Sequence, residues 1–430
     1  MTPRKKLRIV RIVARLNVGG PARHVTLLTE SFRTKGWYSE LVVGEVADTE
    51  GSMEGFAASR QIHPIKIPEL GRELHFFRDI KTLYKVLCLL YRLKPDIVHT
   101  HTAKAGAVGR LAAFLYRRGH WRGFWAPRPL LIYHTFHGHV LRGYFSPFKE
   151  WVFRRIEKFL AGISTNLITL SPALRRELVE MGIAPACMVV IVPLGLELDP
   201  FGDRNAKTPG RNSLCRELGL PEDVPLVGIV GRLVPIKDHA TFLRAVSILV
   251  KNAKSDHRAA SAHFVIVGDG ELREKLEAHA AELNIMDRCH FIGWRDDLPE
   301  IYESLEIVAL TSLNEGTPVC LIEGMAAARP IVATRVGGVA DLTGEAESGS
   351  SGHEISDGDF KAVSVGVLTR PEDPGGFSRA IAYLLEDKER SAGLGQAGRA
   401  RVRDRYSVGR LVEDLTDLYV KGHEESGNKA

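Results

Sequence analysis

The chain has 430 residues, of which 44% are hydrophobic and 26% charged, a composition typical of a globular protein with room for two or three domains. It has no run of about 18 apolar residues, so we expect no transmembrane helix, and its N-terminus lacks the apolar core of a signal peptide. The five cysteines are scattered without CxxC pairs, which disfavours a disulfide framework or a metal cluster and makes the cytoplasm the expected compartment.

Charge is distributed unevenly along the chain. The net charge of +6 divides into a basic part, with 30 Lys and Arg against 14 Asp and Glu in residues 1–192, and an acidic remainder, with 28 against 38. No acidic residue occurs between Asp96 and Glu150, where cations alternate with aromatic side chains. We therefore expect the two halves to bind different partners.

The first half alternates β-branched runs with amphipathic helical patterns, which predicts a parallel sheet covered by helices on both faces. Right-handed crossovers make such a sheet Rossmann-like. The expected strands are residues 7–14, 40–43, 97–100, 130–134, 167–170 and 189–192, and the expected helices are residues 22–35, 77–93, 105–117, 148–160 and 173–181.

The second half repeats this alternation, which predicts a second domain of the same kind. Its expected strands are residues 226–230, 263–267, 289–292, 307–310, 331–333 and 366–368, and its expected helices are residues 239–250, 272–283, 298–304, 319–328 and 377–385. Residues 193–225 are interpreted as a linker, residues 344–360 as a surface loop, and residues 408–421 as a C-terminal helix.

Two carboxylates, Glu315 and Glu323, stand eight positions apart in L-N-E-G-T-P-V-C-L-I-E-G-M-A-A-A-R-P, residues 313–330. Gly316 opens a Gly-Thr-Pro turn, and we expect a helix to begin near Pro318, where the missing N–H costs nothing. Free backbone N–H groups beside two acids suit a ligand that carries both phosphate and hydroxyl groups. The alternative is that both acids are solvated surface residues.

A second motif, V-G-I-V-G-R-L-V-P-I-K-D-H at residues 227–239, places two cations after a buried strand. Arg232 and Lys237 precede a helix that Asp238 is expected to cap. Cations at the carboxyl end of a strand, beside a helix N-terminus, indicate a diphosphate site. The alternative is an ordinary pair of surface cations.

Three further turns follow predicted strands. G-D-G begins at Gly268; Gly19 and Gly20 precede Arg23 without the G-x-G-x-x-G pattern of dinucleotide sites; and Y-H-T-F-H-G ends at Gly138. The last turn contains His137 and is followed by His139, while His101 ends the preceding strand. The histidines lack metal-site spacing, so we expect no metal.

These motifs together resemble those of the retaining family-4 glycosyltransferases, over nearly the whole chain from Leu7 to about Lys421. The resemblance implies the GT-B fold, an α/β architecture of two Rossmann-like doubly wound domains that face each other across a cleft. The implied domains are an acceptor-binding domain at residues 1–195, a nucleotide-sugar-binding domain at 196–405, and a helix at 406–430 that crosses back to the first domain.

The resemblance also implies roles for individual residues. Glu315 would hold the hydroxyls of the donor sugar and Glu323 the ribose, while Arg232 and Lys237 would stabilise the departing diphosphate. His137 would lie beside the reaction centre and is counted as catalytic together with Arg232, Lys237 and Glu315. Further contacts to the donor are expected from Gly19, Gly20, Gly268 and Gly316, and contacts to the acceptor from Arg23, His101 and His139.

The predicted activity is metal-independent transfer, with retention, from a UDP- or GDP-sugar to a glycan or lipid-linked acceptor in envelope or extracellular polysaccharide synthesis. The nucleotide sugar is a co-substrate, and no cofactor is expected. The alternatives are a sugar-nucleotide epimerase and a non-catalytic nucleotide-binding subunit. Because residues 97–149 are basic and aromatic, we also hypothesise that the helix at 105–117 and the loop W-R-G-F-W bind an anionic membrane from the cytoplasmic side. We expect no nucleic-acid partner, because no known binding module is present.

Overall fold

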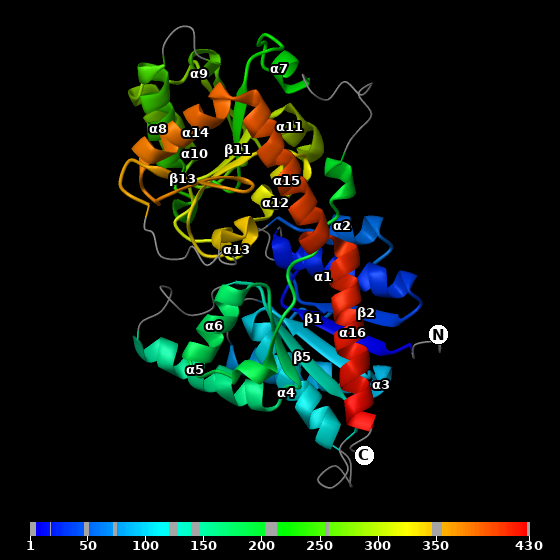
Figure 1. The fold of residues 1–430 in the computed structure, drawn as a ribbon. Coiled ribbons are helices and arrows are strands. Elements are labelled where there is room, and N and C mark those ends of the chain that lie inside the picture. Colours follow the sequence, from blue (N-terminus) through cyan, green and yellow to red (C-terminus); the bar gives the residue numbers. More distant parts are fainter. Residues whose placement is uncertain are drawn as a thin grey trace. The chain divides into compact units, whose positions relative to one another are not determined.

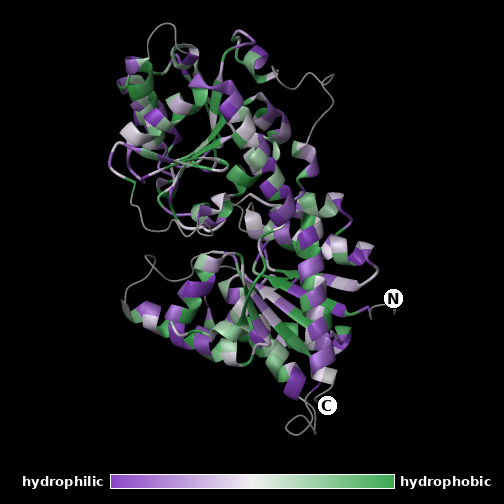
Figure 2. Cartoon of the chain, in the orientation of Figure 1, coloured by the Kyte–Doolittle hydropathy of each residue, from purple (hydrophilic) through white to green (hydrophobic). Residues whose placement is uncertain are grey.

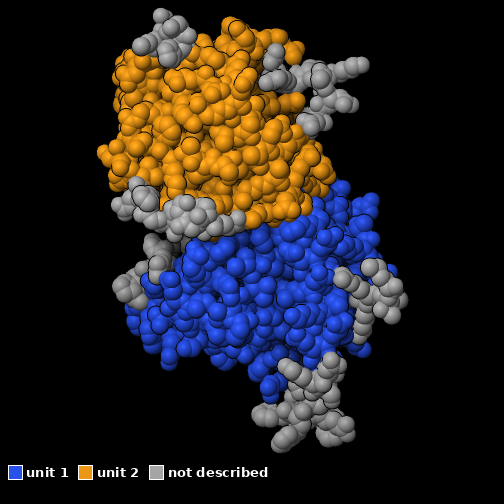
Figure 3. All heavy atoms as spheres, in the orientation of Figure 1, with its two compact units in different colours: residues 1–196, 408–430 blue, residues 197–407 orange. Residues whose placement is uncertain are grey.

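The computed structural model describes residues 6–17, 19–46, 51–71, 75–119, 128–138, 147–202, 213–253, 258–345 and 355–427. The chain divides into two compact units (Figure 3). Unit 1 comprises residues 1–196 and 408–430, and unit 2 comprises residues 197–407. These boundaries differ by one and two residues from those expected from the sequence, and the C-terminal helix belongs to unit 1.

Unit 1 is built on a seven-stranded sheet with the order β3-β2-β1-β4-β5-β6-β7, in which every pair is parallel (Figure 1). The strands are β1 (Arg8–Val13), β2 (Tyr38–Val43), β3 (Ile65–Lys66), β4 (Ile97–His101), β5 (Leu131–Phe136), β6 (Asn166–Thr169) and β7 (Val189–Ile191). The two-residue β3 was not predicted. Central strands such as β4 and β5 are buried along their whole length, as expected for a parallel sheet covered on both faces.

The helices of unit 1 form a layer on each face of this sheet. They are α1 (Gly20–Thr34), α2 (Glu54–Ser59), α3 (Phe76–Leu93), α4 (Ala103–Arg118), α5 (Pro147–Gly162), α6 (Pro172–Glu180) and α16 (Val408–Gly427). One core joins α1 and α16 to the face of the sheet that carries Tyr133. Another joins α3 and α4 to the opposite face, and α5 packs beside α4 on that side.

Unit 2 has a second seven-stranded sheet, with the order β10-β9-β8-β11-β12-β14-β13. The strands are β8 (Leu226–Val230), β9 (His263–Val267), β10 (Cys289–Gly293), β11 (Ile307–Leu310), β12 (Ile331–Thr334), β13 (Phe360–Val363) and β14 (Gly366–Thr369). All pairs are parallel except β13 with β14, which form an antiparallel edge. In both units the strands are markedly more apolar than the outer helices (Figure 2).

The helices of unit 2 lie on both faces of its sheet. They are α7 (Ser213–Glu217), α8 (His239–Asn252), α9 (Arg258–Ser261), α10 (Arg273–Glu282), α11 (Leu298–Ser304), α12 (Val319–Ala326), α13 (Val339–Thr343), α14 (Pro374–Glu386) and α15 (Lys388–Tyr406). Among the described residues, none of the helices of either unit is long and apolar enough to cross a membrane.

Two segments differ from what the sequence led us to expect. Residues 193–225 are not simply a linker, because Phe201 is buried against Tyr302 and α7 contributes Leu214 to the interior of unit 2. Residues 346–354 of the predicted loop at 344–360 lie outside the described residues, and the last residue of the range, Phe360, begins β13 and is part of the sheet edge.

Each sheet has a point at which the direction of winding reverses. In unit 1 this point lies between β1 and β4, and in unit 2 it lies between β8 and β11. The loops that follow such neighbouring strands diverge, so a crevice opens at the carboxyl edge, where ligands of doubly wound sheets bind. The sequence motifs with charged and histidine side chains fall on these two edges.

Candidate active site

The centre of the site in unit 2 is an ion pair that bridges the loops after β8 and β11. The Nζ atom of Lys237 lies 2.5 Å from Oε1 of Glu315, and the hydroxyl of Ser312 donates to the same oxygen at 2.6 Å. Glu315 is only 9% exposed. A carboxylate can remain charged at this depth because a cation and a hydroxyl compensate for its lost hydration.

Backbone contacts hold these two loops together. Lys237 lies in the 3-10 turn η3 (Pro235–Lys237), whose Ile236 carbonyl accepts from the Leu313 amide at 2.9 Å. The hydroxyl of Thr311 donates to the Lys237 carbonyl at 3.1 Å. The Lys237–Glu315 pair is therefore positioned by β8 and β11 themselves, and it occupies the reversal point of the sheet.

Arg232 and the G-D-G turn lie on the neighbouring part of this edge. The Gly231 amide bonds the carbonyl at the end of β9, and the Leu233 amide bonds the Asp269 carbonyl at 3.0 Å. Gly268 has a φ of +127°, and a Cβ there would lie 2.1 Å from the Gly231 oxygen. Only glycine permits this approach. The exposed guanidinium of Arg232 extends from the same loop pair.

A second pair of glycines, not predicted from the sequence, lies against the E-G-T-P turn. The Gly338 amide donates to the Glu315 carbonyl at 3.0 Å. A Cβ on Gly337 or Gly338 would lie within 2 Å of the carbonyl oxygen of Glu315 or Gly316, respectively. The available signal was a Gly-Gly turn directly after the predicted strand at 331–333. This turn could not be assigned to the site from the sequence, because only the order of the strands in the folded sheet places it beside Glu315.

Glu323 lies on α12, the helix that follows this turn. As expected, the helix begins just after Pro318, and its residues 321–326 are buried. Glu323 is 4% exposed, and the hydroxyl of Tyr302 donates to its Oε2 at 3.3 Å. Tyr302 was not predicted as part of the site. The two predicted carboxylates thus belong to one rigid turn-and-helix segment.

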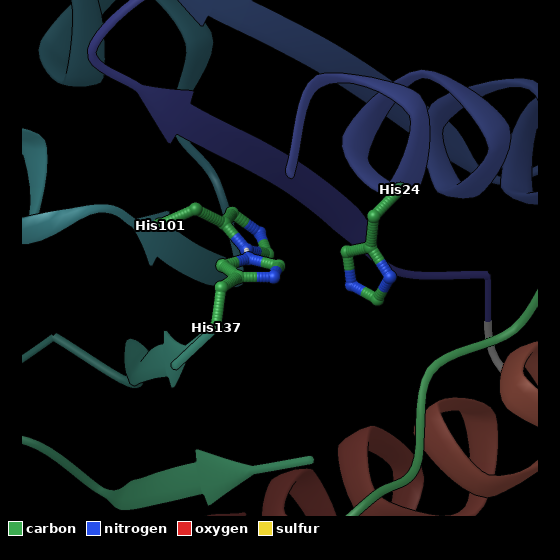
Figure 4. A group of neighbouring side chains, drawn as sticks. All are labelled: His24, His101 and His137. Carbon is green, nitrogen blue, oxygen red and sulfur yellow. Dashed lines mark hydrogen bonds between the residues drawn. The ribbon is translucent and has the colours of Figure 1, made fainter. Parts of the chain in front are cut away.

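The site in unit 1 consists of imidazoles at the reversal point between β1 and β4. His24 extends from α1, His101 ends β4, and His137 follows β5 (Figure 4). The Nδ1 atom of His101 lies 3.0 Å from Nε2 of His137, and the His24 ring meets the His137 ring edge-on with centroids 5.0 Å apart. His24 was not predicted, because a histidine on the inner face of a helix is also typical of an ordinary core.

Burial keeps these imidazoles neutral near pH 7. It lowers the pKa of His137 to about 4, and it holds the pKa values of His24 and His101 well below the ordinary value, with neighbouring positive charge acting in the same direction. Each ring therefore has one nitrogen that donates and one that accepts. Such groups can hydrogen-bond sugar hydroxyls without adding charge.

A network of buried hydrogen bonds adjoins these imidazoles. Nδ1 of His99 lies 2.6 Å from the hydroxyl of Tyr419 on α16, and its Nε2 lies 2.7 Å from Thr135. Arg11, which is fully buried, interacts with Tyr419 and donates to Ser39 at 2.6 Å. His99 also packs against His101, with ring centroids 4.3 Å apart.

The three histidines are also the group that could hold a metal ion among the described residues. One potential ligand nitrogen from each of His24, His101 and His137 lies within 4.8 Å of the others. Three neutral imidazoles match the ligand type of zinc sites. The fold thus brings together three histidines whose spacing in the sequence did not indicate a metal site.

The remaining predicted residues lie at the start of α1. Gly20 is the first residue of α1, and the Gly19 carbonyl accepts from the Arg23 amide at 3.4 Å. The guanidinium of Arg23 lies over the ring of Phe56, 5.9 Å from its centroid. Gly19, Gly20 and Arg23 thus flank the edge that carries His24, while His139 lies outside the described residues.

Comparisons with known proteins assign the chain to a family. Residues 211–401 match the model of glycosyl transferases group 1, and residues 19–195 match a glycosyl transferase 4-like domain. A galactosyltransferase of Escherichia coli, named for UDP-Gal and α-D-GlcNAc-diphosphoundecaprenol, is 26% identical over 82% of each chain. CapM, a capsular polysaccharide glycosyltransferase of Staphylococcus aureus, is 24% identical over 84% of this chain and 86% of its own.

Solved structures show the same fold. Anabaena HepE in complex with UDP has a TM-score of 0.75 at 19% identity, over 96% of this chain and 99% of its own. A sucrose-phosphate synthase from Thermosynechococcus elongatus has a TM-score of 0.72 at 19% identity, over 96% and 98%. The protein belongs to the family-4 glycosyltransferases with the GT-B fold, and both units have the expected Rossmann-like architecture.

Proposed function

We propose that this glycosyltransferase transfers a sugar, with retention and without a metal ion, from a nucleotide-diphosphate sugar to a glycan or lipid-linked acceptor. The observation that carries the proposal is the Lys237–Glu315 pair at the reversal point of the unit 2 sheet. A cation and an acid held together at a ligand-binding edge offer one group for phosphate and one for sugar hydroxyls.

The donor would use these groups in the following way. Arg232 and Lys237 bind the diphosphate oxygens, and they stabilise the negative charge that grows there as the bond to the anomeric carbon breaks. Glu315 accepts hydrogen bonds from the sugar, and Glu323 accepts them from the ribose. Further contacts to the donor would come from the backbone of the turns that contain Gly268 and Gly316, where glycine allows close approach.

The attack of the acceptor depends on the negative charge that develops on the departing diphosphate. Retention requires the new bond to form on the face from which the diphosphate leaves. The acceptor oxygen attacks the anomeric carbon while the carbon–oxygen bond to phosphate breaks, and the acceptor proton passes to the departing phosphate oxygen. The neutral imidazole of His137 orients hydroxyls beside the reacting carbon and requires no proton of its own.

Two of the matched relatives suggest the substrate class. The E. coli galactosyltransferase is named for a UDP-sugar and a diphosphoundecaprenol-linked acceptor, and HepE binds UDP. We propose a UDP-sugar as donor, with a GDP-sugar as the alternative. We also propose a lipid-linked diphosphate saccharide as acceptor, used in envelope or extracellular polysaccharide synthesis on the cytoplasmic side. The excess of basic residues in residues 1–192 suits an anionic acceptor.

The test is a transfer assay with a panel of UDP- and GDP-sugars and a short-chain polyprenyl-diphosphate saccharide. The proposal predicts acceptor-dependent release of the nucleoside diphosphate, with an anomeric proton signal in the product that matches the configuration of the donor. Inversion of that configuration would overturn the retaining mechanism.

The same assay separates the two alternatives. A sugar-nucleotide epimerase would convert the donor with no acceptor present. A non-catalytic subunit would bind the nucleotide and give no product with any acceptor.

A further inference from the structure

Exposed aromatic side chains of unit 1 gather on one helical layer. Isolated exposed apolar residues are ordinary, whereas a group of them on one layer marks an interaction surface. The most exposed of these residues on α3 and α5 are Phe76, Phe77, Tyr84, Phe148, Trp151 and Phe159. Both helices belong to the layer that covers the face of the sheet opposite α1 and α16.

The exposed aromatic residues are most regularly spaced on helix α5. Phe148, Trp151, Arg155 and Phe159 follow one another at intervals of three or four residues, which places them on one side of the helix. Phe148 is 72% exposed, Trp151 56% and Phe159 59%. The Phe148 and Trp151 rings stack with centroids 6.3 Å apart, and Arg155 lies over the Trp151 ring at 5.7 Å.

The side of α5 that faces the interior packs against the rest of unit 1. This helix therefore does not depend for its packing on the outward aromatic stripe, which consists of Phe148, Trp151 and Phe159. Leu160 is buried, and Glu157 accepts from the buried Arg110 at 2.8 and 3.0 Å. Aromatic side chains on the outward side would normally be replaced by polar ones on a free surface. Their presence there requires a partner that takes up apolar rings.

The charges around the stripe define that partner. Lys149, Arg154, Arg155 and Lys158 are all exposed on α5. The one buried acid of the helix, Glu157, is paired inward, and Glu150 is half-buried. An outward stripe of aromatic rings bordered by cations matches a lipid surface with anionic head groups, where rings insert at the level of the head groups and cations attract the phosphates.

The membrane hypothesis for residues 105–117 stays a prediction, although two cations in this part of α4 are not free at the surface. Arg110 is fully buried against Glu157, and Lys104 just before that span pairs with Asp79 at 2.7 Å. These cations hold α4 to its neighbours and are not available to lipids. The loop W-R-G-F-W lies outside the described residues.

We propose that the outer side of α5 binds the surface of an anionic lipid bilayer. The proposal rests on the proposed function in one respect, because it names the surface on which a lipid-linked acceptor would be met. The rings of Phe148, Trp151 and Phe159 enter the head-group region, and the flanking Lys and Arg side chains contact lipid phosphates. Binding is interfacial and reversible, and it becomes weaker as salt screens the cations.

The experiment is vesicle flotation with the full chain and two lipid compositions. One set of vesicles contains phosphatidylcholine alone, and the other contains equal parts of phosphatidylcholine and phosphatidylglycerol. We expect flotation with the anionic vesicles at low salt, a loss at high salt, and little flotation with the neutral ones. Equal flotation with both compositions, or none with either, would overturn the proposal.

Two variants and a control assign the binding to α5. The triple change Phe148→Ser, Trp151→Ser and Phe159→Ser should weaken partitioning by at least about tenfold, because it removes most of the inserted apolar surface. Arg154→Gln with Lys158→Gln should remove the preference for anionic lipid. Trp294→Ser, at a 59% exposed tryptophan of unit 2, is the matched control and should float like the wild type.

Two readouts separate this proposal from its rivals. Brominated lipids should quench tryptophan fluorescence in the wild type and much less in Trp151→Phe, which retains an aromatic ring at that position. If the stripe instead contacts a second copy of the chain, the triple variant changes the oligomeric state without vesicles and flotation is unaffected, which refutes the proposal. Transfer to a water-soluble acceptor tests the proposed function alone, since the triple variant should retain it.

Discussion

The two sheets share one winding pattern but carry different chemistry where the strand order reverses. In unit 2 the reversal point holds a charged pair, Lys237 with Glu315, beside the exposed Arg232. In unit 1 the corresponding point holds imidazoles that burial keeps neutral, with His101 and His137 sharing a hydrogen bond. We therefore expect the fold to determine where a ligand binds, and the side chains to determine whether that edge binds charged or hydroxyl groups.

This contrast indicates that the two edges have different roles in the reaction. Charged side chains are most useful where a reaction changes the charge of the substrate, which for a nucleotide sugar is at the departing diphosphate. Neutral imidazoles are most useful where several hydroxyls must be oriented without attracting phosphate. We therefore expect variants in unit 2 to affect the chemical step strongly, and variants of the unit 1 histidines to affect both the orientation of substrate hydroxyls and the stability of the fold.

The largest effect is expected from the cations of unit 2. Arg232→Ala and Lys237→Ala should each lower kcat/KM by roughly 10²–10³-fold, the cost of losing one preorganised donor to developing negative charge. Steady-state release of UDP from the preferred donor measures this. Lys251→Ala, at an exposed lysine of α8, is the control. Turnover near the wild-type value in both site variants would remove the diphosphate role.

The next effect is a pH dependence of stability from the histidines of unit 1. Burial lowers the pKa of His137 from 6.5 to about 4, so the unfolded chain binds its proton first as the pH falls. Stability from this group is complete above about pH 6.5 and is lost on acidification towards pH 4, by about 3 kcal/mol in total. His24, His99 and His101 act in the same direction.

Denaturant unfolding of His137→Asn at a series of pH values tests this dependence. The variant should lose stability less steeply than the wild type between about pH 6.5 and 4, whereas His63→Asn, at an exposed histidine, should follow the wild type. Identical slopes for His137→Asn and the wild type would show that His137 is protonated as easily in the folded state.

A smaller effect is expected from the hydroxyl of Tyr419. Tyr419→Phe keeps the ring in the core but removes the partner of His99 and of the buried Arg11, which should cost about 1–3 kcal/mol of unfolding free energy. Urea denaturation measures the loss, with Tyr84→Phe at an exposed position as the control. An unchanged or higher stability would mean that solvent or another group replaces this hydroxyl.

The smallest effect is expected from metal removal. Dialysis against a chelator should leave the rate of transfer unchanged within about twofold, because side-chain cations can perform the electrostatic task of a metal. A loss of activity that a divalent ion restores would contradict metal independence. Elemental analysis of His24→Asn and His101→Asn would then show whether the imidazole cluster is the binding site.

Much of this comparison could be predicted from the sequence. The β-branched runs indicated the strands, and because these strands are parallel, the motifs that follow them had to meet at one edge. Arg232, Lys237, Glu315 and Gly268 therefore lie on the same edge of unit 2, as the motifs had suggested. Their roles in the reaction remain predictions.

What could not be predicted depended on tertiary contacts. Helix α15, Lys388–Tyr406, is rich in charge and glycine and has no clear apolar period, so it is stable mainly because α12 and α14 pack against it. His24 and Tyr302 were not recognised because their partners come from distant strands and helices. Arg110 looked like a surface cation because its partner, Glu157, lies outside the acid-free span.

The central claim is that the charged edge of unit 2 holds the nucleotide diphosphate. Isothermal titration of UDP tests it most directly, using the wild type, the double variant Arg232→Ala with Lys237→Ala, and the unit 1 variant His101→Asn. We expect the double variant to weaken UDP binding by at least about tenfold, and His101→Asn to bind UDP nearly as well as the wild type. Retained affinity in the double variant, with affinity lost in His101→Asn, would contradict it.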